Sequence, residues 1–232
     1  MRGTRLLALA GATVFAVAGC STADPAEPAA TAGQVTAAPA TPAPTGSPSP
    51  LKERVIASSA LLQPDDLSGA ALEPLGAGQS AHLRPARPCG ARYPSDATRT
   101  AAVAMRAQVS PGAGQTPLIV LQYVGLHPGN AAAAFAEIAA AVSSCPGSLK
   151  AGQHEWRAAG TDVAGDESML LRVSDRFEYG GSEVTTTTPV VVARVGDYIT
   201  VVADLGWESA SGDEEYVRQL AAKAVERLRT NG

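Results

Sequence analysis

The sequence predicts an α+β domain in which an antiparallel sheet of about five or six strands is packed by two main helices and carries one disulfide. Three observations predict this class. Apolar and polar residues alternate over 98–109, as in a half-buried strand. Apolar residues recur every three or four positions over 131–144 and 213–229, as on one face of a helix. The dipeptide Gly196-Asp197 separates two β-rich segments and suits a hairpin turn.

The first hairpin is predicted from 98–109 and 118–124. Alternate residues from Ala101 to Val109 share one face, and Arg106 belongs to the more polar opposite face. The second segment is more apolar, and a loop rich in Gly and Pro joins the two, so we expect them to pair antiparallel. Alternatively, the alanine-rich sequence allows this region to begin as a helix around 95–106.

The two helices are predicted from their spacing and their ends. Asn130 is a favourable N-cap for the helix over 131–144. Before the helix over 213–229, Ser211 and Glu214 have the spacing of a capping box. Each apolar stripe is expected to pack against the sheet.

Three further β-rich segments complete the predicted sheet. The residues Arg176 to Tyr179 are expected in a loop before Gly180-Gly181. The predicted strands are 169–173, 190–195 and 198–203.

The N-terminus has the order of an export signal. Two arginines precede an apolar run over 6–17, which is shorter than the about 20 residues of a membrane-spanning helix. The run ends in Val-Ala-Gly-Cys, which resembles the bacterial lipobox. We therefore expect 1–19 to be a lipoprotein signal peptide and Cys20 to carry fatty acyl groups such as palmitate. The alternative is an ordinary secretory cleavage, with Cys20 incidental.

Composition divides the rest of the chain into two parts. Residues 20–50 are almost wholly Ala, Pro, Thr, Gly and Ser, which predicts a disordered tether. Residues 51–232 have the composition and length of one globular domain. The formal charge is −4 and no basic patch is evident, so no nucleic-acid partner is expected. The expected location is the extracytoplasmic face of the cell membrane, held there by the N-terminal lipid.

Cysteine usage predicts one disulfide. With Cys20 acylated, Cys89 and Cys145 are the remaining thiols of a chain exported to an oxidising compartment, so they are expected to pair. The alternative is two free buried cysteines. A metal site is disfavoured because neither cysteine has a CxxC partner and the three histidines are scattered. No cofactor is predicted.

No catalytic motif is recognised. Ser182 lacks the second glycine of a nucleophile elbow. His154-Glu155 begins like a zincin helix, but position 158 is Ala where the second histidine would stand. The acidic residues over 162–167 lack the calcium-loop pattern of an EF-hand. The sequence therefore predicts a protein that is not an enzyme.

Scarce aromatic residues supply the only ligand-binding candidates. Arg176 and Tyr179 are expected in the loop before the paired glycines, and Trp207 follows the last strand. Loops on a rigid sheet often carry binding groups. The alternative is that Phe177 and Trp207 pack over the edge of the core while Arg176 is solvated.

The order of several segments resembles a known family. These segments are 61–67 (Leu-Leu-Gln-Pro-Asp-Asp-Leu), Cys89 before Tyr93, an alanine-rich helix closed by Cys145, Gly165-Asp166-Glu167, and the hairpin centred on Gly196. The pattern is similar to the extracellular sensor domain of the mycobacterial serine/threonine kinase PknH and to related actinobacterial lipoproteins. That sensor domain has two disulfides, of which this chain can form the first. The resemblance implies a cleft-bearing, ligand-binding extracytoplasmic domain.

Three function classes follow from these predictions. The first is a membrane-anchored sensor or solute-binding domain for an unknown small ligand. The second is a non-enzymatic adaptor that binds another cell-envelope protein or polymer. An enzyme would need a convergent acid, base and nucleophile that the sequence does not display.

Overall fold

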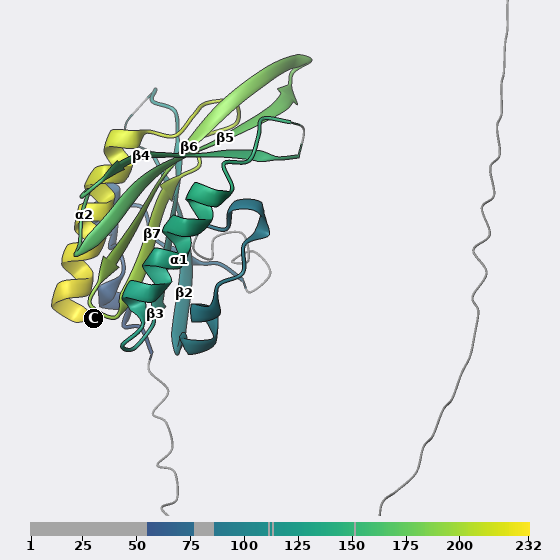
Figure 1. Cartoon of the computed structure of the whole chain (residues 1–232). Helices are drawn as coiled ribbons and strands as arrows, with labels where there is room; N and C mark the ends of the chain where they lie inside the picture. The colour runs from purple at the N-terminus through teal and green to yellow at the C-terminus, as the bar shows by residue number, and fades with distance from the viewer. Residues whose placement is uncertain (1–54, 77–85, 111, 113, 151) are drawn as a thin grey trace, which may run out of the picture. The chain divides into compact units, whose positions relative to one another are not determined.

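The computed structural model describes residues 55–76, 86–110, 112, 114–150 and 152–232. These residues form a seven-stranded sheet with strand order β1-β2-β3-β7-β6-β5-β4, in which all neighbours are antiparallel, and two α-helices (Figure 1). The predicted signal peptide, Cys20 and the tether lie outside the described residues. The strands are β1 (Glu73–Pro74), β2 (Ala101–Val109), β3 (Leu118–Leu126), β4 (His154–Thr161), β5 (Glu167–Tyr179), β6 (Ser182–Val195) and β7 (Tyr198–Asp204), and the helices are α1 (Ala131–Ser144) and α2 (Glu214–Asn231).

The α+β class is confirmed, and the sheet has more strands than the predicted five or six. The additional strands are the two at its edges, β1 and β4. Residues over 95–106 do not form the alternative helix: a short 3-10 helix, η5 (Pro94–Thr98), precedes β2. The predicted hairpin of β2 and β3 is confirmed, with Ala101 opposite Leu126 and Val109 opposite Leu118.

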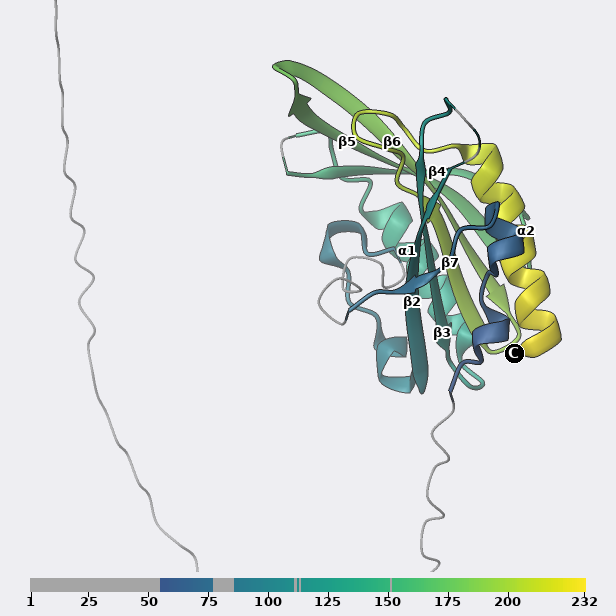
Figure 2. The same cartoon turned by 180° about the vertical axis from the view of Figure 1, so that it is seen from behind.

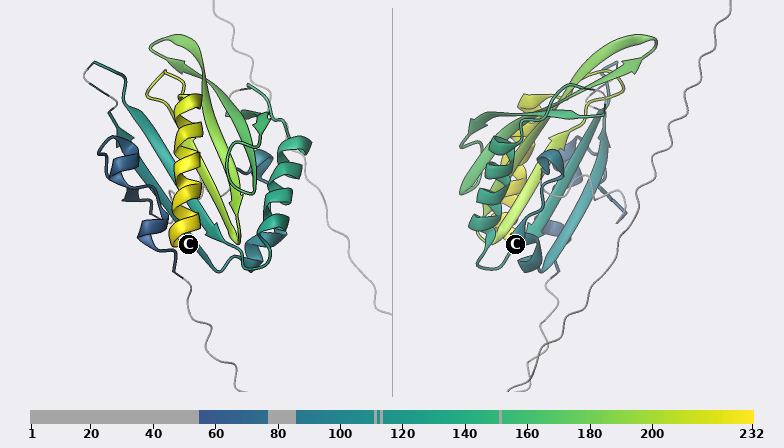
Figure 3. Two further views of the ribbon diagram at one scale, coloured as in Figure 1. Left: turned by 90° about the vertical axis from the view of Figure 1, so that its left-hand side faces the viewer. Right: turned by 45° about the vertical axis from the view of Figure 1, so that its right-hand side comes forward.

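The two α-helices cover opposite faces of the sheet (Figure 3). Side chains point alternately to the two faces of a strand, and the buried residues divide accordingly. Leu171 of β5 packs with α1, whereas its neighbour Leu170 packs with α2. Two 3-10 helices, η1 (Ser58–Ala60) and η2 (Pro64–Leu67), lie beside α2 on the second face (Figure 2).

The hairpin of β6 and β7 turns at Gly196-Asp197, as predicted. Gly196 has a φ of +55°, in the left-handed region that glycine enters without steric cost. The turn also anchors neighbouring loops, because the Asp197 carboxylate accepts a hydrogen bond from the backbone N–H of Gly129 at 2.9 Å.

The helix bounds were predicted closely and Asn130 is the N-cap of α1 as predicted, but the predicted capping box of Ser211 and Glu214 is wrong. Asn130 does not cap α1 with its side chain; its amide donates to the Thr98 hydroxyl at 2.8 Å. The N-cap of α2 is Asp213, whose carboxylate accepts from the backbone N–H of Tyr216 at 3.0 Å. Ser211 instead accepts from the N–H of Thr187, so its hydroxyl fastens the chain before α2 to β6.

The prediction that residues 176–179 form a loop is also wrong, because they continue β5. Phe177 lies opposite Val184 of β6, and the pairing continues to Tyr179 opposite Ser182. The neighbouring strands stop earlier: β4 pairs with β5 only as far as Asp175, and β7 pairs with β6 only from Val190. Residues 176–185 therefore form a two-stranded ribbon that projects from the sheet (Figure 1). Paired backbone groups, rather than side-chain burial, hold this polar segment extended.

The predicted disulfide is present. Cys89 and Cys145 are bonded, with their Cα atoms 6.1 Å apart. The first cysteine belongs to a 3-10 helix, η4 (Pro88–Gly90), and the second is the C-cap of α1. The bond therefore fastens the segment before β2 to the end of α1, as the sequence predicted.

Candidate functional site

A cavity of about 750 Å³ opens on the face of the sheet that α1 covers. Its volume lies within the range of about 300–1,000 Å³ that is common for small-molecule sites. Its lining is mainly apolar with a few polar groups, which is the usual composition of such sites. The lining residues are Leu75, Ala86, Arg87, Gly90, Arg106, Ile119, Leu121, His154, Trp156, Val173, Asp175, Thr188, Val190, Val201, Ala203 and Leu205.

The floor of the cavity is the sheet itself. Ile119, Leu121, Val201 and Ala203 are buried residues of β3 and β7 that belong to the core packed beneath α1. They project to this face because alternate residues of a strand do so. Trp156 of β4 is partly buried against the same core and forms part of the far wall. The cavity thus continues the core into a region that α1 leaves open.

One wall comes from the segment around η4, which the disulfide fixes to α1. Arg87 lines the cavity, but its guanidinium is already engaged. It donates to Asp96 at 2.5 Å and to the carbonyl of Ala91 at 2.7 Å, and it lies 4.9 Å from the centre of the Tyr93 ring. Because these contacts use its charge and its donors, Arg87 holds the wall together rather than offering a free cation.

Tyr93 and Asp96, two titratable residues of the segment that forms this wall, have pKa values shifted in opposite directions. Burial raises the pKa of the Tyr93 phenol to about 12, although the nearby charge of Arg87 lowers it. Burial also raises the pKa of Asp96, but the hydrogen bonds and charges of Arg87 and Arg99 outweigh it, so the net pKa is lowered. At neutral pH Tyr93 is therefore a neutral donor, bonded to the Ala86 carbonyl, and Asp96 is an anion.

The far rim of the cavity carries a paired acid and base. His154 of β4 and Asp175 of β5 are cross-strand partners, and the Nδ1 atom of the imidazole contacts the carboxylate. Thr188 supplies a hydroxyl group to the lining. His154 and Asp175 contact one another, so this rim carries no unpaired cation.

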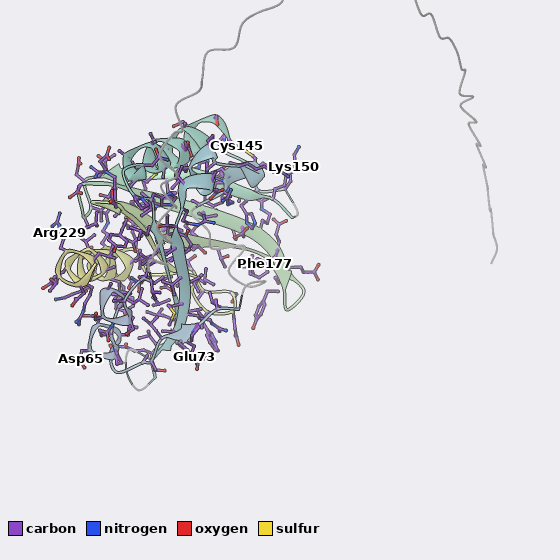
Figure 4. The ribbon with its side chains drawn as sticks, turned by 90° about the horizontal axis from the view of Figure 1, so that it is seen from below. Asp65, Glu73, Cys145, Lys150, Phe177 and Arg229 are labelled. Atoms are coloured by element: carbon purple, nitrogen blue, oxygen red, sulfur yellow. A yellow bond between two sulfur atoms is a disulfide. The ribbon has the colours of Figure 1, made fainter. Side chains whose placement is uncertain are left out.

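Arg106 of β2 differs from these residues. It is exposed, lines the opposite end of the cavity, and forms no ion pair with any residue that the structure describes. Glu73 of β1 is its cross-strand partner and lies at the sheet edge (Figure 4), but the two side chains are not in contact as an ion pair. Arg106 is therefore the unpaired cation of the lining.

The predicted ligand-binding residues do not line the cavity. Arg176 faces the other side of the ribbon and forms an ion pair with Glu183 at 3.6 Å. Tyr179 donates to Glu208 at 2.8 Å, and Trp207 is partly buried against the core beneath α1. The structure places Tyr179 and Arg176 on opposite faces of β5, so these three side chains do not converge on one point.

Sequence reasoning missed most of the lining. Arg106 was assigned only to the more polar face of its strand. Two signals were available: Arg106 follows two alanines on its face of β2, and β3 is apolar on both faces apart from Gln122. Neither signal could show that α1 would leave this part of the face uncovered.

A second cavity, of about 570 Å³, lies near the C-terminal end of α2. Its carboxylate, Asp166, accepts from the backbone N–H of Gly196 at 2.8 Å and pairs with Arg194 and Arg229 at 3.3 Å. The Gly196 hydrogen bond is the main reason that the pKa of Asp166 is lowered, with further lowering from both arginines. These groups compensate one another, so the first cavity is the stronger candidate for ligand binding.

Within the described ranges, no group of three or more His, Cys, Asp or Glu residues is arranged to hold a metal ion. No helix of that part of the chain is long and apolar enough to span a membrane. Comparison with protein-family models, with curated proteins and with solved structures found no match. The fold and the site define an α+β domain with an open cavity on one face of an antiparallel sheet.

Proposed function

We propose that this protein is a membrane-anchored extracytoplasmic lipoprotein whose globular domain binds a small, largely apolar ligand. The observation that carries the proposal is the cavity of about 750 Å³, floored by apolar strand residues. An open apolar cavity leaves hydrophobic surface in contact with water, and a ligand that covers this surface is stabilised by about 25 cal/mol per Å² buried. The lipobox-like sequence at Cys20 supports the anchor.

Ligand binding is tested on oxidised residues 20–232 carrying Cys20→Ser, a chain that lacks the predicted signal peptide and acylation site and needs no detergent. Thermal unfolding is followed with envelope lipids, glycans, peptidoglycan fragments and metabolites. A ligand at 100 times its dissociation constant adds about 2.7 kcal/mol to the free energy of unfolding. For a domain of this size, that corresponds to an increase in Tm of about 5–10 °C.

A cavity-filling variant locates the site. Ala203→Phe places a ring on the cavity floor, and Ala136→Phe makes the same change on an exposed position of α1. The proposal requires that Ala203→Phe abolish the Tm increase and that Ala136→Phe retain it, with both variants folded by circular dichroism. If no compound of the panel stabilises the protein, or if the Phe at position 203 has no effect on binding, the cavity is not a ligand site.

The anchor has its own test. In cells supplied with labelled palmitate, the full chain is expected to incorporate the label and to sediment with membranes. Cys20→Ser in the full chain is expected to lose the label and to keep its signal peptide uncleaved, because lipobox cleavage follows acylation of the cysteine. An unlabelled chain that is still cleaved after residue 19 would favour ordinary secretion.

An adaptor is the second candidate, and the ribbon favours it. Phe177 is 36% exposed and Tyr179 is 43% exposed, and both lie on the same face of the ribbon (Figure 4 shows Phe177). Exposed aromatic residues are enriched at protein interfaces. A photo-crosslinker at position 177 would capture one defined envelope partner that the same group at position 176, on the opposite face, does not capture. Equal capture at both positions would argue against an adaptor surface here.

A further inference from the structure

The cavity is elongated across the sheet. Its lining follows the spatial order of the strands from Arg106 on β2, through β3, β7, β6 and β5, to Trp156 on β4. Neighbouring strands are about 4.8 Å apart, so these five spacings span about 24 Å. The hydrocarbon region of a bilayer is about 30 Å thick, so one acyl chain reaches about half of that distance. The cavity floor is therefore long enough for an acyl chain and a head group.

The two ends of the cavity differ in charge. At the β4 end, His154 and Asp175 are paired with one another, and Trp156 presents an apolar ring. At the β2 end, Arg106 has no ionic partner among the described residues. Between the two ends the floor is apolar apart from Thr188. A ligand that matches this distribution is apolar along most of its length and anionic at one end.

Two charged side chains near Arg106, Glu73 and Arg87, could influence its interaction with a ligand. Glu73 lies opposite it across β1 and β2 without forming an ion pair, and Arg87 is committed to Asp96. The guanidinium of Arg106 is therefore available to a ligand anion, and a guanidinium binds carboxylate or phosphate in a bidentate manner.

We infer that the ligand is a single-chain anionic amphiphile. Its carboxylate or phosphate lies against Arg106, and its chain crosses the floor formed by β3, β7 and β6 toward Trp156. This inference rests on the proposed function, since it names the ligand class of the same cavity. Carboxylate and phosphate share the chemistry that Arg106 recognises, and the experiment below distinguishes them.

The test measures dissociation constants for the Cys20→Ser chain by titration calorimetry. The ligands are decanoate, tetradecanoate, the alcohols of the same lengths, and the corresponding monoalkyl phosphates. A charge-assisted hydrogen bond predicts that each acid or phosphate binds at least about tenfold more tightly than its alcohol. Each added methylene is expected to strengthen binding by up to about fourfold while the chain remains on the apolar floor. The tighter of the two anions identifies the head group.

Variants locate the two ends of the ligand. Arg106→Gln is expected to weaken anion binding by about tenfold and to leave the alcohols unchanged, because the lost interaction is charge-assisted. Arg176→Gln removes an arginine from the ribbon face that points away from the cavity and serves as the matched control. Trp156→Ala is expected to weaken the binding of tetradecanoate more than the binding of decanoate, because the shorter chain ends before it reaches the far wall.

The outcomes separate the inference from the proposed function. If alcohols and acids bind equally, or if Arg106→Gln does not discriminate between them, the anionic amphiphile is excluded while a ligand-binding cavity remains. If a ligand of another class binds and Ala203→Phe blocks it, the inference fails and the proposed function stands. If no ligand binds in a manner sensitive to Ala203→Phe, both fail.

Discussion

The two faces of the sheet are covered in different ways. On one face, α2 buries six residues against the strands, and the segment over 58–67, which contains η1 and η2, fills the space beside it with Leu61, Leu62 and Leu67. On the other face, α1 buries four residues, and the segment that contains η4 and η5 completes the layer. Only the second face contains the elongated apolar cavity. The residues that α2 buries are Val217, Leu220, Ala221, Ala224, Val225 and Leu228.

This difference originates in the covering layers and not in the sheet. The strands supply large apolar residues to both faces, as Leu170 and Leu171 illustrate on β5. The α2 layer adds broad side chains and a hydrogen-bonded ion pair between Arg227 and Asp66 at 3.1 Å. The α1 layer buries fewer helix residues and is fastened by the disulfide. A tightly packed face thus provides stability, while the loosely covered face leaves room for a ligand.

Alanine substitution of one leucine on each face tests this difference in packing most directly. Leu220 of α2 and Leu121 of β3 are both buried, but Leu121 also borders the cavity. Leu220→Ala is expected to lower the free energy of unfolding by about 4–5 kcal/mol, since a closed cavity forms, whereas Leu121→Ala costs about 2–3 kcal/mol. Urea unfolding of both variants measures the difference. Equal losses would mean that the two faces are packed equally well.

Removing the disulfide tests how the α1 face is fastened. In the Cys20→Ser background, replacing Cys89 and Cys145 by Ser is expected to cost about 3–4 kcal/mol, because the bond closes a long loop in the unfolded chain. Hydrogen exchange should increase more in 86–96 and α1 than in α2, which has no covalent link to η4.

Reduction of the chain that retains both cysteines is the control for this variant and should reproduce its exchange pattern. A uniform increase across α1 and α2 would contradict the assignment of the disulfide to one layer. Such a result would instead indicate that the two faces unfold as a single cooperative unit.

Much of this fold could be predicted from the sequence. Both α-helices, the β2–β3 hairpin and the turn at Gly196-Asp197 were predicted because local periodicity and turn chemistry determine them. The edge strand β4 was missed because Gly160 and a bulge after Ala158 interrupt its pattern. The ribbon was missed because it is polar on much of its surface and is held by cross-strand pairing.

The candidate site was much less predictable. The disulfide could be predicted because few cysteines were available, but the cavity depends on how much of the sheet α1 covers. Arg106 and His154 are separated by almost fifty residues in the chain and by four intervening strands in the sheet. No local pattern relates two such positions. Asp204 illustrates the same limit, because only the structure shows that its carboxylate is buried at the start of α2.

Substitution of Asp204 is expected to have the smallest effect on stability, and it tests a buried carboxylate that is bonded to the N-cap of α2. Its carboxylate accepts from the backbone N–H groups of Gly206 at 2.9 Å and Asp213 at 2.8 Å. Burial is the main influence and raises the pKa of Asp204 above its ordinary 3.8, although these two hydrogen bonds oppose it. Asp204→Asn removes the charge and leaves one N–H without an oxygen acceptor, at a cost of about 1 kcal/mol.

The raised pKa fixes the direction of the pH dependence. Between 3.8 and the pKa in the folded state, the folded protein binds the Asp204 proton more tightly than the unfolded chain does. Stability from this group is therefore greatest at low pH and declines as the pH rises through that window. The lowered pKa values of Asp96 and Asp166 act in the opposite sense, so only the difference between the two proteins isolates Asp204. Urea unfolding at several pH values should show the natural protein losing stability relative to Asp204→Asn as the pH rises, whereas a difference that does not vary with pH would mean that burial leaves this carboxylate unperturbed.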